Sequence, residues 1–159
     1  MSPTAVNWML FLHILAALWL AAGVFASTVV RAQARRAATL AERVVVLRIG
    51  ARLAKVFSLP GGLIAGLLGF GLLHPLGWGF RPGWVKVSIA LWLLMVLNGI
   101  LYLRPSLERL LAATEASAAA GAPTAELTRL AASKGPHIAA DLNALGLVLL
   151  TLLMVVRPF

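Results

Sequence analysis

Four long apolar runs constrain this chain more than any other feature of its sequence. They extend from about Val6 to Val30, Val56 to Leu73, Val87 to Leu103 and Ile138 to Val156. A helix needs roughly 20 apolar residues, with a range of about 17–25, to cross a bilayer. Backbone groups in lipid must be satisfied within the protein, and continuous rather than alternating runs do this as helices. We therefore predict an all-α fold, a bundle of four transmembrane helices that forms a single integral membrane domain over residues 1–159.

Composition supports the membrane class and excludes several kinds of function. Only 12% of the residues are charged, whereas a soluble domain has about 25%. The net charge of +9 does not indicate nucleic-acid binding, because the basic residues flank apolar runs instead of forming a patch on a soluble domain. The chain has no cysteine, which excludes disulfides, thiol catalysis, cysteine-ligated zinc and iron–sulfur clusters.

The distribution of Lys and Arg predicts the orientation of the bundle. The connections 31–55 and 104–135 carry eleven basic residues, and the other side of the membrane carries three. By the positive-inside rule, the two long connections lie in the cytoplasm and both termini lie on the outer side. Residues 38–47 are expected to form an amphipathic helix on the membrane surface. Ser106 to about Ala118 extends the third helix, and a short helix starts near Thr124, with Thr124 as its N-cap.

Helix two contains a proline and a row of glycines. Pro60 removes an intrahelical hydrogen bond and is expected to kink this helix. Gly62 and Gly66 form a GxxxG pair, and Gly69 continues the same face. Such glycines let a neighbouring helix approach closely.

His13 is the leading candidate for a functional residue. A histidine within hydrocarbon is costly, and neutral imidazole is the commonest metal ligand among side chains. His13 lies 17 positions from Val30 and His74 lies 18 positions from Val56, so both are about 26–27 Å from the expected inner boundary. Such a pair could be the axial ligands of one haem b. The alternatives are that His13 bonds to a neighbouring helix and that His74, which precedes Pro75, meets water at the interface.

A second polar level is predicted nearer the cytoplasm. Asn98 and Asn143 each lie six positions from the expected inner boundary, and a hydrogen bond between helices three and four is predicted there. Asp141 needs a cationic partner, because charges within a membrane usually pair. The candidate partners are Arg31, Lys55 and Arg104.

Several segments together resemble a known superfamily. They are Phe11-Leu12-His13 followed by Trp19, Gly23 and Arg31; Val56–Gly61; Gly83–Lys86; and Leu153–Phe159. In this order they resemble small four-helix membrane proteins that include the haem-b, oxygen-independent protoporphyrinogen oxidase of bacteria and the membrane domain of the copper-resistance D protein. The most similar branch is a set of predicted integral membrane proteins of unknown function, which has a similar Phe-Ser-Leu-Pro-Gly segment and a similar long connection after helix three.

The resemblance implies a location and a set of cofactor contacts. It implies a multi-pass protein of the bacterial inner membrane. The oxidase branch implies that His13 ligates haem iron and that a lysine lies in helix three. That lysine corresponds to Lys86 only with a shift, because the expected position is nearer Ser88. The oxidase motif Asn-Glu-x-Pro in helix four is replaced here by the stretch that begins at Asn143 and lacks the Glu and the Pro.

Three functional hypotheses follow. The first is a cytochrome b-like protein that binds haem b for electron transfer or haem handling, with His13 as a metal ligand, His74 as the second ligand and Lys86 facing a propionate or reaching lipid headgroups. Trp19 and Arg31 complete this set of cofactor-binding residues. The second is an oxidoreductase, the protoporphyrinogen oxidase itself, passing electrons to quinone. The third is a haem-free accessory subunit.

The expected partners follow from these hypotheses. They are the lipid bilayer, a quinone or a porphyrin, a larger respiratory or redox membrane complex, and a second copy of the chain in a homo-oligomer. Nucleic acid is not among them. Copper transport is disfavoured, because the four methionines form no cluster in the sequence.

Overall fold

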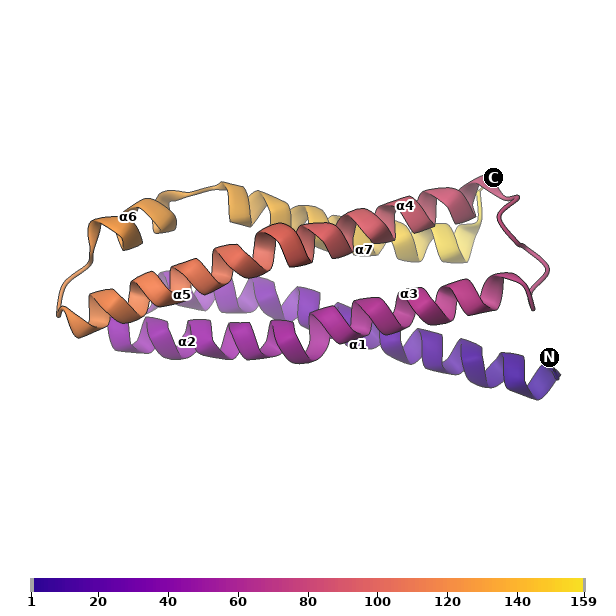
Figure 1. Ribbon diagram of the computed structural model, residues 1–159, viewed down its shortest axis with the longest axis horizontal. Coiled ribbons are helices and arrows are strands. Elements are labelled where there is room, and N and C mark those ends of the chain that lie inside the picture. Colours follow the sequence, from indigo (N-terminus) through magenta and orange to yellow (C-terminus); the bar gives the residue numbers. More distant parts are fainter. Residues whose placement is uncertain (1, 159) are drawn as a thin grey trace.

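The computed structural model describes residues 2–158 and consists of helices joined by short turns (Figure 1). Within these residues there is no β-strand, and four continuous helices are long and apolar enough to cross a membrane, which confirms the predicted fold class. The elements in chain order are α1 (Pro3–Arg36), α2 (Leu40–Leu53), η1 (Ala54–Ser58), α3 (Leu59–Leu73), α4 (Gly83–Asn98), η2 (Gly99–Leu103), α5 (Arg104–Ala119), α6 (Ala125–Ala132) and α7 (Gly135–Val156).

The helices lie side by side and form an elongated bundle (Figure 1). Both ends of the chain lie at one end of it, which we call the terminal end; α2, α5 and α6 form the opposite end, which we call the basic end. The segments α2, η1 and α3 form one continuous helix, Leu40–Leu73, and α4, η2 and α5 form another, Gly83–Ala119. The helices therefore extend well beyond the predicted apolar runs and include most of the predicted connections.

Side-chain caps define where the shorter helices begin. Thr39 accepts a hydrogen bond from the backbone N–H of Glu42 (3.1 Å), and the Glu42 carboxylate accepts one from the N–H of Ala38 (2.8 Å). The two bonds resemble a capping box, with the carboxylate bonded to the N–H one residue before the N-cap, and they fix the start of α2. Thr124 caps α6 in the same manner by accepting from the N–H of Leu127 (3.3 Å), which confirms the predicted N-cap.

The helix predicted over residues 38–47 is confirmed from Leu40 onward, but it is part of the bundle instead of lying alone on a membrane surface. This segment belongs to α2, which continues without interruption into η1 and α3. Two contacts hold it along the bundle: Gly50 packs directly against Val30 of α1, and Arg48 forms an ion pair with Glu115 of α5 (2.8 Å). An amphipathic segment with partners on two sides buries its apolar face against protein instead of lipid.

Each of the two composite helices contains a π turn just before a proline. The N–H of Leu59 bonds to the carbonyl of Ala54, one residue before Pro60, and the N–H of Arg104 bonds to the carbonyl of Gly99, one residue before Pro105. A proline ring clashes with the carbonyl four residues earlier in a regular α-helix. The wider turn removes this conflict, so the predicted perturbation at Pro60 takes the form of a π bulge.

Glycines bring α1 into backbone contact with the helix Leu40–Leu73. A Cβ atom added at Gly61 would lie 2.6 Å from the backbone nitrogen of Leu20, and one added at Gly23 would lie 2.5 Å from the hydroxyl of Ser58. Real Cβ atoms do not approach other atoms this closely. The two helices can therefore meet only because these positions have no side chain.

A second pair is formed by α4 and α7. The Asn98 side-chain amide donates to the Asn143 side-chain oxygen (2.8 Å) and to the Ala139 carbonyl (2.9 Å). The Asn143 amide in turn donates to the carbonyl of Met95 (3.3 Å). The predicted bond between Asn98 and Asn143 is confirmed. A small core of Val24, Met95 and Leu147 joins this pair to α1.

The contact at Gly61 generates a stability prediction. We expect Gly61→Ala to lower the free energy of unfolding by about 1–3 kcal/mol, because the new methyl group meets the backbone of Leu20. The matched control is Gly99→Ala, where no atom lies within 4 Å of the added Cβ. Unfolding of both variants in a detergent titration, followed by circular dichroism, measures the difference. Equal stability of the two variants would contradict the packing described here.

Candidate functional site

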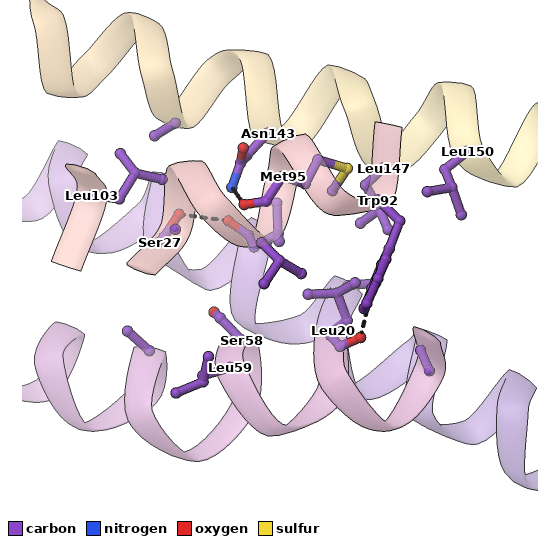
Figure 2. A pocket seen from close by; sticks show the side chains of 18 of the residues that line it. Leu20, Ser27, Ser58, Leu59, Trp92, Met95, Leu103, Asn143, Leu147 and Leu150 are labelled. Atoms are coloured by element: carbon purple, nitrogen blue, oxygen red, sulfur yellow. Dashed lines mark hydrogen bonds between the residues drawn. The ribbon is translucent and has the colours of Figure 1, made fainter. Parts of the chain in front are cut away.

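A long cleft of about 1470 Å³ separates the pair α1 and α3 from the pair α4 and α7 (Figure 2). Its lining is mainly apolar. In Figure 2, Ser58 and Leu59 extend into the cleft from below, and Met95 and Leu147 extend from the opposite side. The volume exceeds the range of about 300–1,000 Å³ that is common for ligand pockets, so a cofactor-sized molecule has room.

The cleft opens sideways between α1 and α7. Leu18 and Phe25 of α1 and Val148 and Val155 of α7 all line it, yet their exposed fractions are 49–75%. Apolar side chains that are so exposed on a membrane-spanning helix face acyl chains. At the basic end the opening is closed, because α1 and α7 are joined by an ion pair that is described next.

Arg31 joins α1 to α7. Its Nη2 atom lies 3.1 Å from a carboxylate oxygen of Asp141, and only 19% of the arginine side chain is exposed. Arg31 was one of three predicted partners for Asp141, and the structure selects it. The other terminal guanidinium nitrogen, Nη1, is buried and has no hydrogen-bond partner in the part of the chain that the structure describes.

The Trp92 side chain crosses the cleft (Figure 2). Its indole N–H donates to the carbonyl of Gly62 across the gap between α4 and α3 (2.8 Å), and its ring lies directly on Gly66. Phe70 packs edge-to-face against the same indole, with 5.7 Å between ring centroids. We call the part beyond Trp92 that contains His13 the terminal compartment, and the part from Leu20 toward Arg31 the basic compartment.

His13 lies in the terminal compartment with one ring nitrogen fixed. Its Nδ1 atom is 2.9 Å from the carbonyl oxygen of Ala65 on α3. A carbonyl can only accept a hydrogen bond, so Nδ1 donates and carries the proton. The neutral ring then has its lone pair on Nε2. The ring also lies against Gly69, where an added Cβ would be 3.1 Å from Cε1, and the side chain is half-buried.

The carbonyls that bind Trp92 and His13 share a local arrangement. Gly62 lies four residues before Gly66, and Ala65 lies four residues before Gly69. In an α-helix each carbonyl points toward the residue four positions later. Glycine at that position leaves the oxygen uncovered, so a side chain of another helix can reach its second lone pair.

Ser88 and a group of aromatic rings complete the terminal compartment. The Ser88 hydroxyl is buried and has no hydrogen-bond partner within the described residues. Trp78 and Trp84 form an edge-to-face pair with 5.1 Å between centroids, and the Arg157 guanidinium lies 4.5 Å from the centroid of Trp78. This end of the cleft is therefore walled by large rings and contains one unsatisfied polar group.

The structure brings together only part of the predicted site. His13 and Arg31 line the cleft, but they lie in different compartments. His74 lines a separate, smaller pocket with Trp78 and Arg81, and it is five residues, or about 7.5 Å, beyond Gly69, which His13 contacts. The two predicted histidine ligands are therefore not brought together.

Two other predicted cofactor contacts lie outside the cleft. Lys86 is exposed and does not line it. Trp19 packs edge-on against Phe57 on the outer surface of the α1–η1 contact, with 6.1 Å between centroids. Trp92 was not singled out from the sequence. The sequence did contain a signal for Trp92, because this residue lies far from either end of its span. A tryptophan at that depth needs a hydrogen-bond partner for its N–H.

Comparison with known families identifies the chain. A family model described as "Predicted integral membrane protein (DUF2269)" matches residues 7–158. The chain belongs to this family. The match confirms the predicted branch of integral membrane proteins of unknown function, and with the four apolar helices it makes the chain a multi-pass membrane protein. No curated protein and no solved structure matches the chain.

The bond from Trp92 generates a second prediction. We expect Trp92→Phe to lower the free energy of unfolding by about 1 kcal/mol, because it removes the hydrogen bond to Gly62 while keeping an aromatic ring over Gly66. Trp19→Phe is the matched control, since that indole packs on an outer surface where 40% of the residue is exposed. Detergent unfolding titrations compare the two. A loss of stability in Trp19→Phe as large as that in Trp92→Phe would argue against the bridging role.

Proposed function

We propose that this protein binds one haem b in the terminal compartment, with His13 Nε2 as an axial ligand to the iron. The observation that carries the proposal is the hydrogen bond from His13 Nδ1 to the Ala65 carbonyl. Histidines that bind metals usually donate their other ring N–H to a carbonyl or a carboxylate. That bond selects the tautomer whose free nitrogen binds the metal, and it fixes the plane of the ring.

The other residues of the compartment suit a flat, apolar cofactor. Phe70, Trp84 and Trp92 supply ring surfaces, and Gly66 and Gly69 leave α3 without side chains on the face near His13. A bare metal ion held only by protein side chains has less support, because within residues 2–158 no three His, Asp or Glu side chains are grouped closely enough to hold one. A haem needs only one or two ligands from the protein.

Each residue has a defined task in this proposal. When bound, haem b supplies one-electron redox chemistry. His13 holds the iron, and its bond to a neutral carbonyl makes it a weaker electron donor than a histidine paired with a carboxylate. The aromatic rings exclude water and lower the local dielectric constant, which favours the less charged oxidation state. We propose His13 as the single histidine ligand, because His74 lines a different pocket.

The location and role that we propose follow from charge and resemblance. The eleven basic residues of the two connections support a cytoplasmic basic end, and the resemblance to bacterial proteins supports the inner membrane. Electron transfer or haem handling is the function that one haem in such a bundle would serve. The same bundle without haem would be an accessory subunit. The experiment below distinguishes this alternative from the haem protein.

The test is an absorption spectrum of the detergent-purified protein, oxidised and dithionite-reduced, after haem is supplied. We expect a Soret band in the wild-type protein and in His74→Ala, and its loss in His13→Ala. Histidine 74 is a matched control, since it is the same residue type outside the cleft. Circular dichroism checks that each variant is helical, and added imidazole is expected to restore the Soret band to His13→Ala.

Two results would overturn the proposal. One is a wild-type protein that shows no visible absorption with haem present. The other is a helical His13→Ala variant that keeps its full complement of haem. In either case His13 would be a helix-packing residue, and the bond to Ala65 would serve only to hold α1 against α3.

A further inference from the structure

The basic compartment carries an excess of positive charge that the haem proposal does not use. Seven arginines and lysines of the basic end line the cleft, and the lining contains a single acidic residue, Glu108. That carboxylate is already paired with Arg104 (2.8 Å). Arg31 is balanced by Asp141, yet most of the remaining cations at this end have no acidic neighbour in the lining.

Three buried polar atoms at this end have no hydrogen-bond partner among residues 2–158: Nη1 of Arg31, Nε of Arg43 and Nδ1 of His137. All three residues line the cleft. An unsatisfied buried donor costs about 1–3 kcal/mol, more when it is charged, so such groups usually have a partner. The two arginine nitrogens can only donate, and the histidine nitrogen donates in one of its tautomers or when charged. The missing partner is therefore an acceptor, and the charge favours an anion.

The residues that carry the three groups lie along one stretch of the bundle axis. Asp141 is paired with Arg31, and His137 is one helical turn from Asp141, about 6 Å along α7. Gly50 packs on Val30, next to Arg31, and Arg43 is seven residues from Gly50, about 10.5 Å along α2. All three residues thus fall within about 11 Å along the bundle axis, on three different helices.

Between these donors and Trp92 most residues that line the cleft are apolar; the polar ones are Ser27, Ser58 and Asn143. Ser27 and Asn143 already donate to the backbone carbonyls of Val24 and Met95. Figure 2 shows Leu20, Leu59, Leu103 and Leu147 around this space. From Leu20 to Arg31 the distance along α1 is eleven residues, or about 17 Å. Half of the hydrocarbon core of a bilayer is about 15 Å thick, so one acyl chain of a lipid leaflet matches the length of the compartment.

We propose that the basic compartment binds one anionic phospholipid from the leaflet at the basic end. The phosphate accepts hydrogen bonds from the free nitrogens of Arg31, Arg43 and His137, and one acyl chain lies along the apolar cleft as far as Trp92. The lipid enters between Phe25 and Val148, which line the cleft and are about half exposed. A phospholipid fits better than a free anion, because it satisfies the donors and fills the apolar space as well.

The site is independent of haem. The two ligands are proposed for different sides of Trp92 and contact different residues, so either binding test can fail without the other.

The experiment is a titration of the delipidated, detergent-purified full chain with phosphatidylglycerol, followed by native mass spectrometry. We expect one lipid to bind more tightly than all later ones. Arg43→Gln, which removes one of the three free donors, is expected to weaken this first site about tenfold. Arg36→Gln is the matched control, since Arg36 is an exposed arginine at the same end of the bundle that does not line the cleft. Circular dichroism checks the folding of each variant.

Comparison of ligands separates the sources of the phosphate. Phosphatidylcholine is expected to bind the first site at least tenfold more weakly than phosphatidylglycerol, and inorganic phosphate is expected not to compete. Three results would overturn the proposal: equal binding of the two lipids, equal loss of affinity in Arg36→Gln and Arg43→Gln, or full competition by inorganic phosphate. The second would mean general attraction to a basic surface, and the third would mean an anion site without a tail.

Discussion

The contact between α1 and the helix Leu40–Leu73 is the constraint on which the rest of the structure depends. At Gly23 and Gly61 the two helices approach so closely that a single methyl group would collide with the opposite helix. The pair α4 and α7 is fixed by its own bonds between asparagines. Two rigid pairs of helices that meet at few points leave space between them. The distance between the pairs is set by Trp92 and by the Arg31–Asp141 ion pair. The cleft is a consequence of good packing within each pair.

The sequence predicted the fold class because apolar length alone forces a helix in lipid. It also predicted the Asn98–Asn143 bond, the Thr124 cap and a cationic partner for Asp141, with Arg31 as one of three candidates, since each depends on local spacing or on the cost of a polar group in lipid. It did not predict the cleft, because an apolar run sets the length of a helix and leaves its rotation and separation from its neighbours undefined.

The expected meeting of His13 and His74 failed for a traceable reason. Both depths were counted from the ends of apolar runs, which placed Val30 and Val56 at one level. In the structure Val30 lies opposite Gly50, and Gly23 lies opposite Ser58. Val56 is therefore roughly five residues, or about 7.5 Å, further toward the terminal end than the boundary it was taken to mark. The helix that contains the second apolar run begins in α2, before that run starts. Hydropathy does not show this, because the basic residues of α2 are held by protein contacts.

The glycines of α3 change how the polarity of a membrane helix should be judged. From Leu59 to Leu73 this helix has no polar side chain, and a hydropathy scale describes it as uniform hydrocarbon. Two of its peptide oxygens nevertheless hold the imidazole of His13 and the indole of Trp92. A glycine one turn after each oxygen removes the cover that a side chain would provide. The polar surface of this helix thus consists of backbone oxygens that glycine leaves accessible, and a search restricted to side-chain chemistry would overlook it.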